Sequence, residues 1–161
     1  MKNNKMKLLA VMMMICMLAV GLTGCGGSDS NTIKISLLNE MTGGNATLGT
    51  SAANGAKLAF KEINANGGVL GKQIEAVVAD NKSEPAEAAN AITKLINQDK
   101  VVAVTGTFSS SNAIAAASVA EAAKVPYLAA GATNPKVTVD EKSGKVFDYV
   151  FRVCFIDPFQ G

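Results

Sequence analysis

Residues 101–134, VVAVTGTFSSSNAIAAASVAEAAKVPYLAAGATN, carry the pattern that decides the fold. The apolar run 101–104 predicts a buried strand, and the Gly, Thr and Ser residues of 106–111 predict a turn after it. The alanine-rich segment 112–124 predicts a helix, and 127–130 predicts the next strand. Two strands joined through a helix run parallel in one sheet, so this stretch predicts a parallel α/β unit.

The alternation of strand and helix continues on both sides of this unit. The further expected elements are strands at 33–38, 72–79 and 149–155 and helices at 50–66 and 83–96, with a helix or a hairpin before the last strand. This order predicts an α/β fold, a doubly wound parallel sheet flanked by helices on both faces. If the strand order is 2-1-3-4-5, ligands bind at the carboxyl ends of the first and third strands. The loops at 39–49, 106–111 and 131–135 are then the candidate binding loops.

Ser109, Ser110 and Ser111 stand at the expected start of the helix that follows the third strand. Free N–H groups and the helix dipole at such an end favour an anion, and serine hydroxyls add donors. Ordinary capping by one of the serines explains the same residues equally well. Thr133 also has two readings, because its hydroxyl can contact a carboxylate or an ammonium group or only stabilise its turn.

Composition excludes several classes of function. The chain has 161 residues with 15 Lys and Arg, 13 Asp and Glu, and no His, so it has neither a Ser–His–Asp triad nor a His metal site. Its small net charge does not indicate nucleic-acid binding. Residues 66–73 resemble a phosphate loop but precede a strand, which favours a simple turn. The sequence predicts no catalytic residue, no metal site and no cofactor.

Three acidic residues near strand ends are candidate site residues. Asp80 and Glu84 lack a third clustered ligand, so we interpret them as a solvated strand end and an acidic residue at a helix N-terminus rather than a metal site. Glu40 follows the first strand and faces either a ligand or solvent, a choice the sequence leaves open.

The N-terminal segment is predicted to be an export signal. Three lysines precede the apolar run 8–20, which is shorter than the roughly 20 residues that span a bilayer, so 1–24 is typical of a signal peptide. Residues 22–25, LTGC, resemble the bacterial lipobox, which implies a lipidated Cys25 and a flexible tether over 25–31. The alternative is an ordinary signal peptide with an incidental cysteine. Cys154, the cysteine of the folded part, is interpreted as a small core residue.

A family resemblance extends over about residues 32–161. The stretches 33–75 (IKISLLNEMTGGNATLGTSAANGAKLAFKEINANGGVLGKQIE), 104–135 (VTGTFSSSNAIAAASVAEAAKVPYLAAGATNP) and 151–161 (FRVCFIDPFQG) together resemble branched-chain amino-acid binding proteins. These proteins have the type I periplasmic-binding-protein fold and serve ABC importers. The resemblance implies that 32–161 is the N-terminal lobe of a two-lobe ligand-binding domain, and that the chain is an incomplete version of it.

The resemblance also implies a set of ligand-binding residues in this lobe, namely Ser109, Ser110, Ser111, Gly131, Ala132, Thr133 and Leu48. Ser110, with its two neighbours as alternatives, is expected to donate to the ligand carboxylate. Gly131 and Ala132 are expected to offer backbone groups. Thr133 is expected to give its N–H to the carboxylate and its hydroxyl to the ammonium group. Leu48 is expected to form an apolar wall, at a position where many members have a larger aromatic residue.

The expected function is an extracytoplasmic solute-binding lipoprotein of an ABC importer, with a branched-chain or other hydrophobic amino acid as ligand. Expected partners are that amino acid, the importer's permease and ATPase, and the outer face of the cytoplasmic membrane (or the periplasmic side) through the lipid on Cys25. The alternatives are the sensing domain of an extracellular receptor, a binding protein for an amide or urea-like solute, and a hydrolase that uses Ser110. The chain alone is expected to bind amino acids weakly and to be marginally stable.

Overall fold

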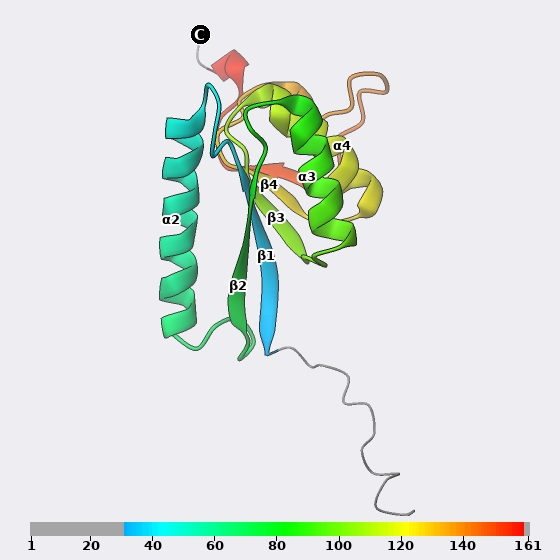
Figure 1. Cartoon of the computed structure of the whole chain (residues 1–161). Coiled ribbons are helices and arrows are strands. Elements are labelled where there is room, and N and C mark those ends of the chain that lie inside the picture. Colours follow the sequence, from blue (N-terminus) through cyan, green and yellow to red (C-terminus); the bar gives the residue numbers. More distant parts are fainter. Residues whose placement is uncertain (1–30, 160–161) are drawn as a thin grey trace, which may run out of the picture. The chain divides into compact units, whose positions relative to one another are not determined.

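The computed structural model describes residues 31–159, which form one five-stranded, all-parallel sheet with strand order β2-β1-β3-β4-β5 (Figure 1). The strands are β1 (Thr32–Asn39), β2 (Gln73–Asp80), β3 (Ala103–Gly106), β4 (Tyr127–Ala129) and β5 (Val150–Arg152). The helices are α2 (Ala46–Ala65), α3 (Pro85–Asn97) and α4 (Ser110–Ala123), with single 3-10 turns η1 (Pro135–Val137) and η2 (Asp157–Phe159). The predicted fold class and the order 2-1-3-4-5 are confirmed. The predicted signal peptide, Cys25 and all but the last residue of the tether lie outside the described residues.

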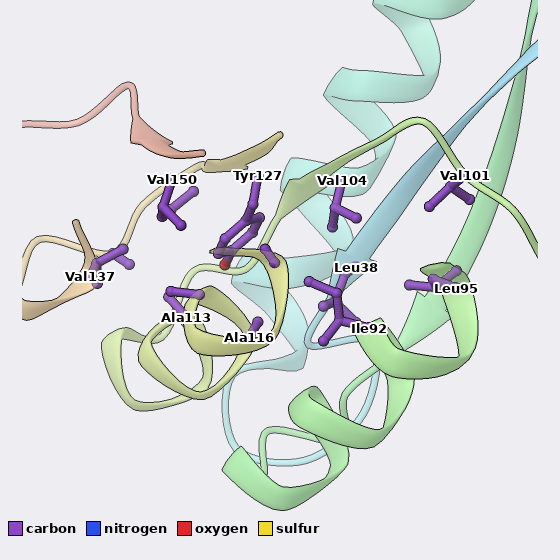
Figure 2. Close-up of a cluster of buried hydrophobic side chains, with 14 residues drawn as sticks. Leu38, Ile92, Leu95, Val101, Val104, Ala113, Ala116, Tyr127, Val137 and Val150 are labelled. Atoms are coloured by element: carbon purple, nitrogen blue, oxygen red, sulfur yellow. The ribbon is translucent and has the colours of Figure 1, made fainter. Parts of the chain in front are cut away.

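Helices cover both faces of the sheet. Figure 1 shows α2 on one side and α3 with α4 on the other. The main core lies between the sheet and the pair α3 and α4, where Leu38, Ile92, Val104 and Tyr127 are almost fully buried (Figure 2). The helix α4 contributes mainly alanines to this core, and their small size lets the helix lie close to both α3 and the sheet.

Two element boundaries differ from the predicted ones because of tertiary contacts. The helix α2 begins at Ala46 rather than at residue 50. A Cβ at Gly49 would lie 2.2 Å from the carbonyl oxygen of Glu40, so glycine lets the first turns of α2 pass directly over the end of β1. The strand β3 begins at Ala103 rather than at 101. The N–H of Val101 donates to the carbonyl oxygen of Leu95 near the end of α3, so Val101 is bonded to the helix and not to a neighbouring strand.

The segment before β5 contains both a short helix and a hairpin. The 3-10 turn η1 is followed by an antiparallel bridge between Val139 and Val146. The strand β5 itself ends at Arg152, three residues before the predicted end at 155. The chain then passes the end of β4, where the N–H of Val153 donates to the carbonyl oxygen of Ala129. Within residues 31–159, no helix has the length and apolar character needed to cross a membrane.

Candidate functional site

A hollow of about 530 Å³ lies at the carboxyl ends of the central strands. Its lining comes from the segments that follow β1, β3, β4 and β5, including the first turns of α2 and α4. Ligands bind to doubly wound sheets at this place. The lining residues are Asn45, Leu48, Phe108, Ser109, Ser110, Ala130, Gly131, Thr133, Cys154 and Phe155. Since none of these ten residues is charged, the hollow suits a neutral or zwitterionic molecule rather than an ion of large net charge.

The start of α4 supplies hydrogen-bond donors to this hollow. Ser109 is the N-cap residue, but its side chain makes no capping hydrogen bond to the helix. The Ser109 hydroxyl lies instead 3.1 Å from the hydroxyl of Ser111. The first N–H groups of a helix have no partner inside it, so this end of α4 keeps donors for another group. Simple capping by Ser109 is therefore not what the structure shows.

Ser110 connects α4 to the loop after β4. Its hydroxyl oxygen accepts a hydrogen bond from the N–H of Asn134 at 3.3 Å. The hydroxyl hydrogen of a serine that accepts in this way is still available for donation. Ser110 can therefore hold the loop and also donate to a ligand.

The loop 131–135 supplies the second group of donors. Within residues 31–159, neither the N–H nor the hydroxyl of Thr133 has a hydrogen-bond partner, and Thr133 lines the hollow. Its carbonyl oxygen accepts from the N–H of Asp157 at 3.1 Å, which fixes the residue from the other side. A Cβ at Gly131 would lie 2.4 Å from the ring of Phe108, so glycine is needed where this loop passes the aromatic ring.

The structure brings together five of the seven predicted ligand-binding residues. Leu48, Ser109, Ser110, Gly131 and Thr133 all line the hollow. The remaining two do not line it. Ser111 lies in the first turn of α4 but is exposed, and Ala132 is fully buried.

Cys154 and Phe155 belong to the wall of the hollow, which the sequence did not predict. Cys154 is only partly buried and lines the hollow, so its interpretation as a core residue is wrong. The physical reason is that β5 ends at Arg152, and the chain beyond it crosses the strand ends instead of continuing the sheet. Phe108 and Asn45 were also missed, although both lie in loops that the strand order marked as binding loops.

Arg152, the only arginine of the chain, holds the loop that carries Thr133. Its guanidinium donates to the carbonyl oxygens of Ala132 at 3.1 Å and Asn134 at 2.9 Å. It also donates to the carbonyl oxygen of Pro135 at 3.0 Å and to the hydroxyl of Thr138 at 2.7 Å. A rigid fork of donors suits several acceptors at once, so one side chain fixes the whole loop.

Asp80 holds the loop after β1, which lies on the other side of the hollow from the loop 131–135. One carboxylate oxygen accepts from the N–H groups of Met41 and Lys82 at 2.9 and 2.8 Å. Thr42 donates its N–H to the same oxygen at 3.2 Å and its hydroxyl to the other oxygen at 2.6 Å. Asp80 therefore ties the loops after β1 and β2 together. The part of the chain that the structure describes contains no group of three acidic or cysteine side chains arranged to bind a metal ion.

Glu40 faces neither solvent nor the hollow, the two possibilities that the sequence left open. It is fully buried, and its carboxylate accepts hydrogen bonds from the N–H groups of Phe108 and Ser109. It lies directly behind the turn that lines the hollow.

Comparisons with known proteins agree with this fold. A family model described as a periplasmic binding protein matches residues 32–158. An amino acid binding protein of Pseudomonas aeruginosa is 39% identical over 129 residues, which are 80% of this chain and 33% of that protein.

Two solved structures are similar over nearly the same part of the chain. The first is the branched-chain amino acid transporter substrate binding protein LivJ of Streptococcus pneumoniae, in complex with isoleucine. It is 46% identical, with a TM-score of 0.71 over 78% of this chain and 34% of its own. The second, a leucine binding protein LivK of Thermotoga maritima, is 40% identical with a TM-score of 0.71, over 80% of this chain and 34% of its own.

The chain thus spans about a third of the length of the relatives that it matches. The family match nevertheless covers almost all of the described residues, and the parallel sheet has the strand order expected for this fold. The chain belongs to the periplasmic binding protein family, among its leucine-binding proteins of type I fold.

Proposed function

We propose that this chain forms the first lobe of an extracytoplasmic solute-binding protein of an ABC importer, with a branched-chain or other hydrophobic amino acid as ligand. One observation carries the proposal. Within residues 31–159, the first turn of α4 and the loop 131–133 both carry hydrogen-bond donors without a partner, and both line one uncharged hollow with apolar walls. The Streptococcus pneumoniae relative, described in complex with isoleucine, supports this choice of ligand.

The lining residues divide into two kinds that match the two parts of such a ligand. The hydroxyl of Ser110 and the N–H of Thr133 suit the ligand carboxylate, and the hydroxyl of Thr133 suits its ammonium group. The side chains of Leu48, Phe108 and Phe155 supply an apolar wall for its hydrocarbon side chain.

The partners follow from the same proposal. A binding protein of this class delivers its ligand to a permease driven by an ATPase. Export through the signal peptide 1–24 and lipidation of Cys25 would hold it at the outer face of the cytoplasmic membrane, because two or more acyl chains anchor a protein stably. Incorporation of labelled palmitate that disappears in the Cys25→Ser variant supports the anchor, and a secreted, unlabelled wild-type protein contradicts it.

Ser110→Ala tests the ligand site directly. The loss of one hydrogen bond to a charged group is expected to lower the affinity for L-isoleucine by about tenfold or more. The measurement is a titration followed by NMR, in which the amide signals of Ser110, Gly131 and Thr133 should shift in the wild type. Ser118→Ala removes an exposed serine from the same helix and serves as the matched control. Shifts confined to residues far from the hollow would contradict the proposed site.

The single lobe is proposed to bind only weakly, since a ligand held on one side gains few contacts. Calorimetry with leucine, isoleucine and valine is expected to give dissociation constants weaker than micromolar. Micromolar or tighter binding by this chain would show that it needs no second lobe.

A further inference from the structure

Glu40 is a buried carboxylate at the switch point of the sheet, and it has four hydrogen bonds. Its Oε2 accepts from the N–H of Phe108 at 2.9 Å, and its Oε1 accepts from the N–H of Ser109 at 3.1 Å. The side-chain amides of Asn112 and Asn81 donate to Oε1 at 3.2 and 3.3 Å. All of the donors come from segments that are about forty to seventy residues away in the chain. Glu40 therefore joins the ends of β1 and β2 to the start of α4.

The turn that Glu40 contacts has a strained backbone. Gly106 has a φ of +123°, and the fully buried Thr107 has a φ of +60°, which is rare for a β-branched residue. Hydrogen bonds from one side hold Thr107 in this conformation. Its N–H donates to the carbonyl oxygen of Leu38 at 2.7 Å and to Oδ1 of Asn39 at 3.2 Å. Asn39 and Glu40 are neighbours, so the end of β1 and the residue after it together fix three consecutive residues of this turn, Thr107, Phe108 and Ser109.

Glu40 also places a negative charge just before the start of α4. The side chain of the N-cap residue Ser109 makes no capping bond, and the carboxylate of Glu40 accepts the N–H of Ser109 itself. A negative charge near a helix N-terminus is favourable there. The N–H groups of Phe108 and Ser109 are thus already used within the protein, and a ligand carboxylate must take its donors from Ser110 and from the loop 131–133.

We propose that Glu40 is a positioning residue of the ligand site. Its carboxylate holds the turn 107–109 in the conformation that places Ser110 and the ring of Phe108 at the hollow. The effect reaches the opposite wall, because the ring of Phe108 lies against Gly131 with no room for a Cβ between them. This inference rests on the proposed function, since it assigns Glu40 a role in the same site.

The variant that tests this role is Glu40→Gln in the full chain. Glutamine keeps the shape but has one acceptor oxygen, and its NH₂ group cannot accept from the N–H of Phe108 or Ser109. The matched control is Glu62→Gln, which removes one exposed carboxylate from α2. Glu40→Asp is a second variant, which retains the charge on a shorter side chain and remains useful if the glutamine variant does not fold.

The first measurement needs no ligand. Amide hydrogen exchange followed by NMR is expected to become at least tenfold faster at Phe108 and Ser109 in Glu40→Gln, with little change at Leu37 and Val104 in the strands. Glu40→Asp is expected to show a smaller increase, and Glu62→Gln none. Equal acceleration at all four amides would mean that Glu40 only stabilises the fold, and this result would overturn the proposal.

The second measurement is the affinity for L-isoleucine, at a temperature where exchange shows each variant to be folded. Glu40→Gln is expected to bind about tenfold more weakly than the wild type, and Glu62→Gln to bind equally well. Unchanged affinity in Glu40→Gln would overturn the positioning role while leaving the proposed function intact. A wild-type chain without any response to isoleucine would instead overturn the proposed function, and the exchange rates would still decide whether Glu40 fixes the turn.

Discussion

The carboxylate of Asp80 joins the loops after β1 and β2. Its ionisation should therefore affect the free energy of unfolding. Partial burial of Asp80 opposes its charged form. The hydrogen bond from the Thr42 hydroxyl, together with those from the N–H groups of Lys82, Met41 and Thr42, outweighs this effect and lowers the pKa of Asp80 below its ordinary value of 3.8. The ionised form is therefore favoured by folding.

The sign of the pH dependence follows from this lowered pKa. The stabilisation is fully present above the pKa of the unfolded chain, near 4, and is lost as pH falls through the lower pKa of the folded protein. Asp80→Asn is expected to lower the free energy of unfolding by about 1–2 kcal/mol at pH 7. Denaturant unfolding at pH 7 and near pH 3 should show that the difference between the two proteins shrinks in acid. A difference that stays constant with pH would contradict the role of the carboxylate.

Gly131 gives a prediction about packing in the site. Its φ is not positive, so alanine fits the backbone there, but a Cβ would lie 2.4 Å from the ring of Phe108. Gly131→Ala should therefore displace the ring and lower the free energy of unfolding by about 1–3 kcal/mol. In a Phe108→Ala background, Gly131→Ala should lower the free energy of unfolding much less, because the ring is absent. A double-mutant cycle of denaturant unfolding measures this difference.

A matched glycine-to-alanine substitution elsewhere in the chain should raise the free energy of unfolding. Gly55 lies inside α2 and has open space where a Cβ would be. Gly55→Ala should stabilise the protein by about 0.5–1 kcal/mol, because alanine favours the helix. If both glycine variants change stability alike, steric contact with Phe108 is not the cause.

The residues of the site could be predicted only where local pattern marks them. Ser110 and Thr133 follow strands directly and lie in Gly- and Ser-rich loops, so their place near a site could be predicted from spacing. Glu40 could not, because its partners Asn81 and Asn112 lie far along the chain and follow no local pattern. The exposure of Cys154 could not be predicted either, because it depends on where β5 ends, which no residue in VFRVCF marks.

At the scale of elements, α4 shows that a sequence can predict a helix without predicting which of its faces is buried. Its alanine-rich sequence predicts a helix but not a buried face, because alanine occurs on every side. In the structure Ala113, Ala116, Ala117 and Ala120 are fully buried against the sheet and α3, whereas Ala122 is exposed. The order of elements was predictable from periodicity, and the burial of individual residues depended on tertiary packing. The early start of α2 at Ala46, next to the closely packed Gly49, has the same origin.

The buried face of α4 predicts the effect of one larger side chain. Ala116→Leu should overfill the space between α4 and the neighbouring core and lower the free energy of unfolding by about 1–3 kcal/mol. Ala122→Leu introduces the same side chain on the exposed face of the same helix and should change stability by less than about 0.5 kcal/mol. Denaturant unfolding measures both. Equal effects of the two variants would mean that α4 is not packed as closely as the structure shows.

At the scale of the whole described fold, the two faces of the sheet are covered unequally. The pair α3 and α4 buries one face over its width, whereas α2 on the other face packs against β1, β2 and β3. Beside α2 lies a hollow of about 350 Å³, whose lining is almost wholly apolar and includes Phe60, Leu128 and Phe151. Leu128 is 37% exposed and Phe151 is 51% exposed. An apolar patch of this kind on a protein in water favours association.

We therefore expect the chain to associate as its concentration rises, with Phe151 contributing strongly. Burial of about 60 Å² of its ring stabilises a contact by about 1.5 kcal/mol, so Phe151→Ser should weaken association by about tenfold. Phe159 is 81% exposed and is not part of the apolar hollow, so Phe159→Ser is the matched control and should leave association almost unchanged. Sedimentation velocity over a hundredfold range of concentration measures this directly. A wild-type chain that stays monomeric throughout, or equal effects of the two serine variants, would show that the apolar hollow beside α2 does not drive association.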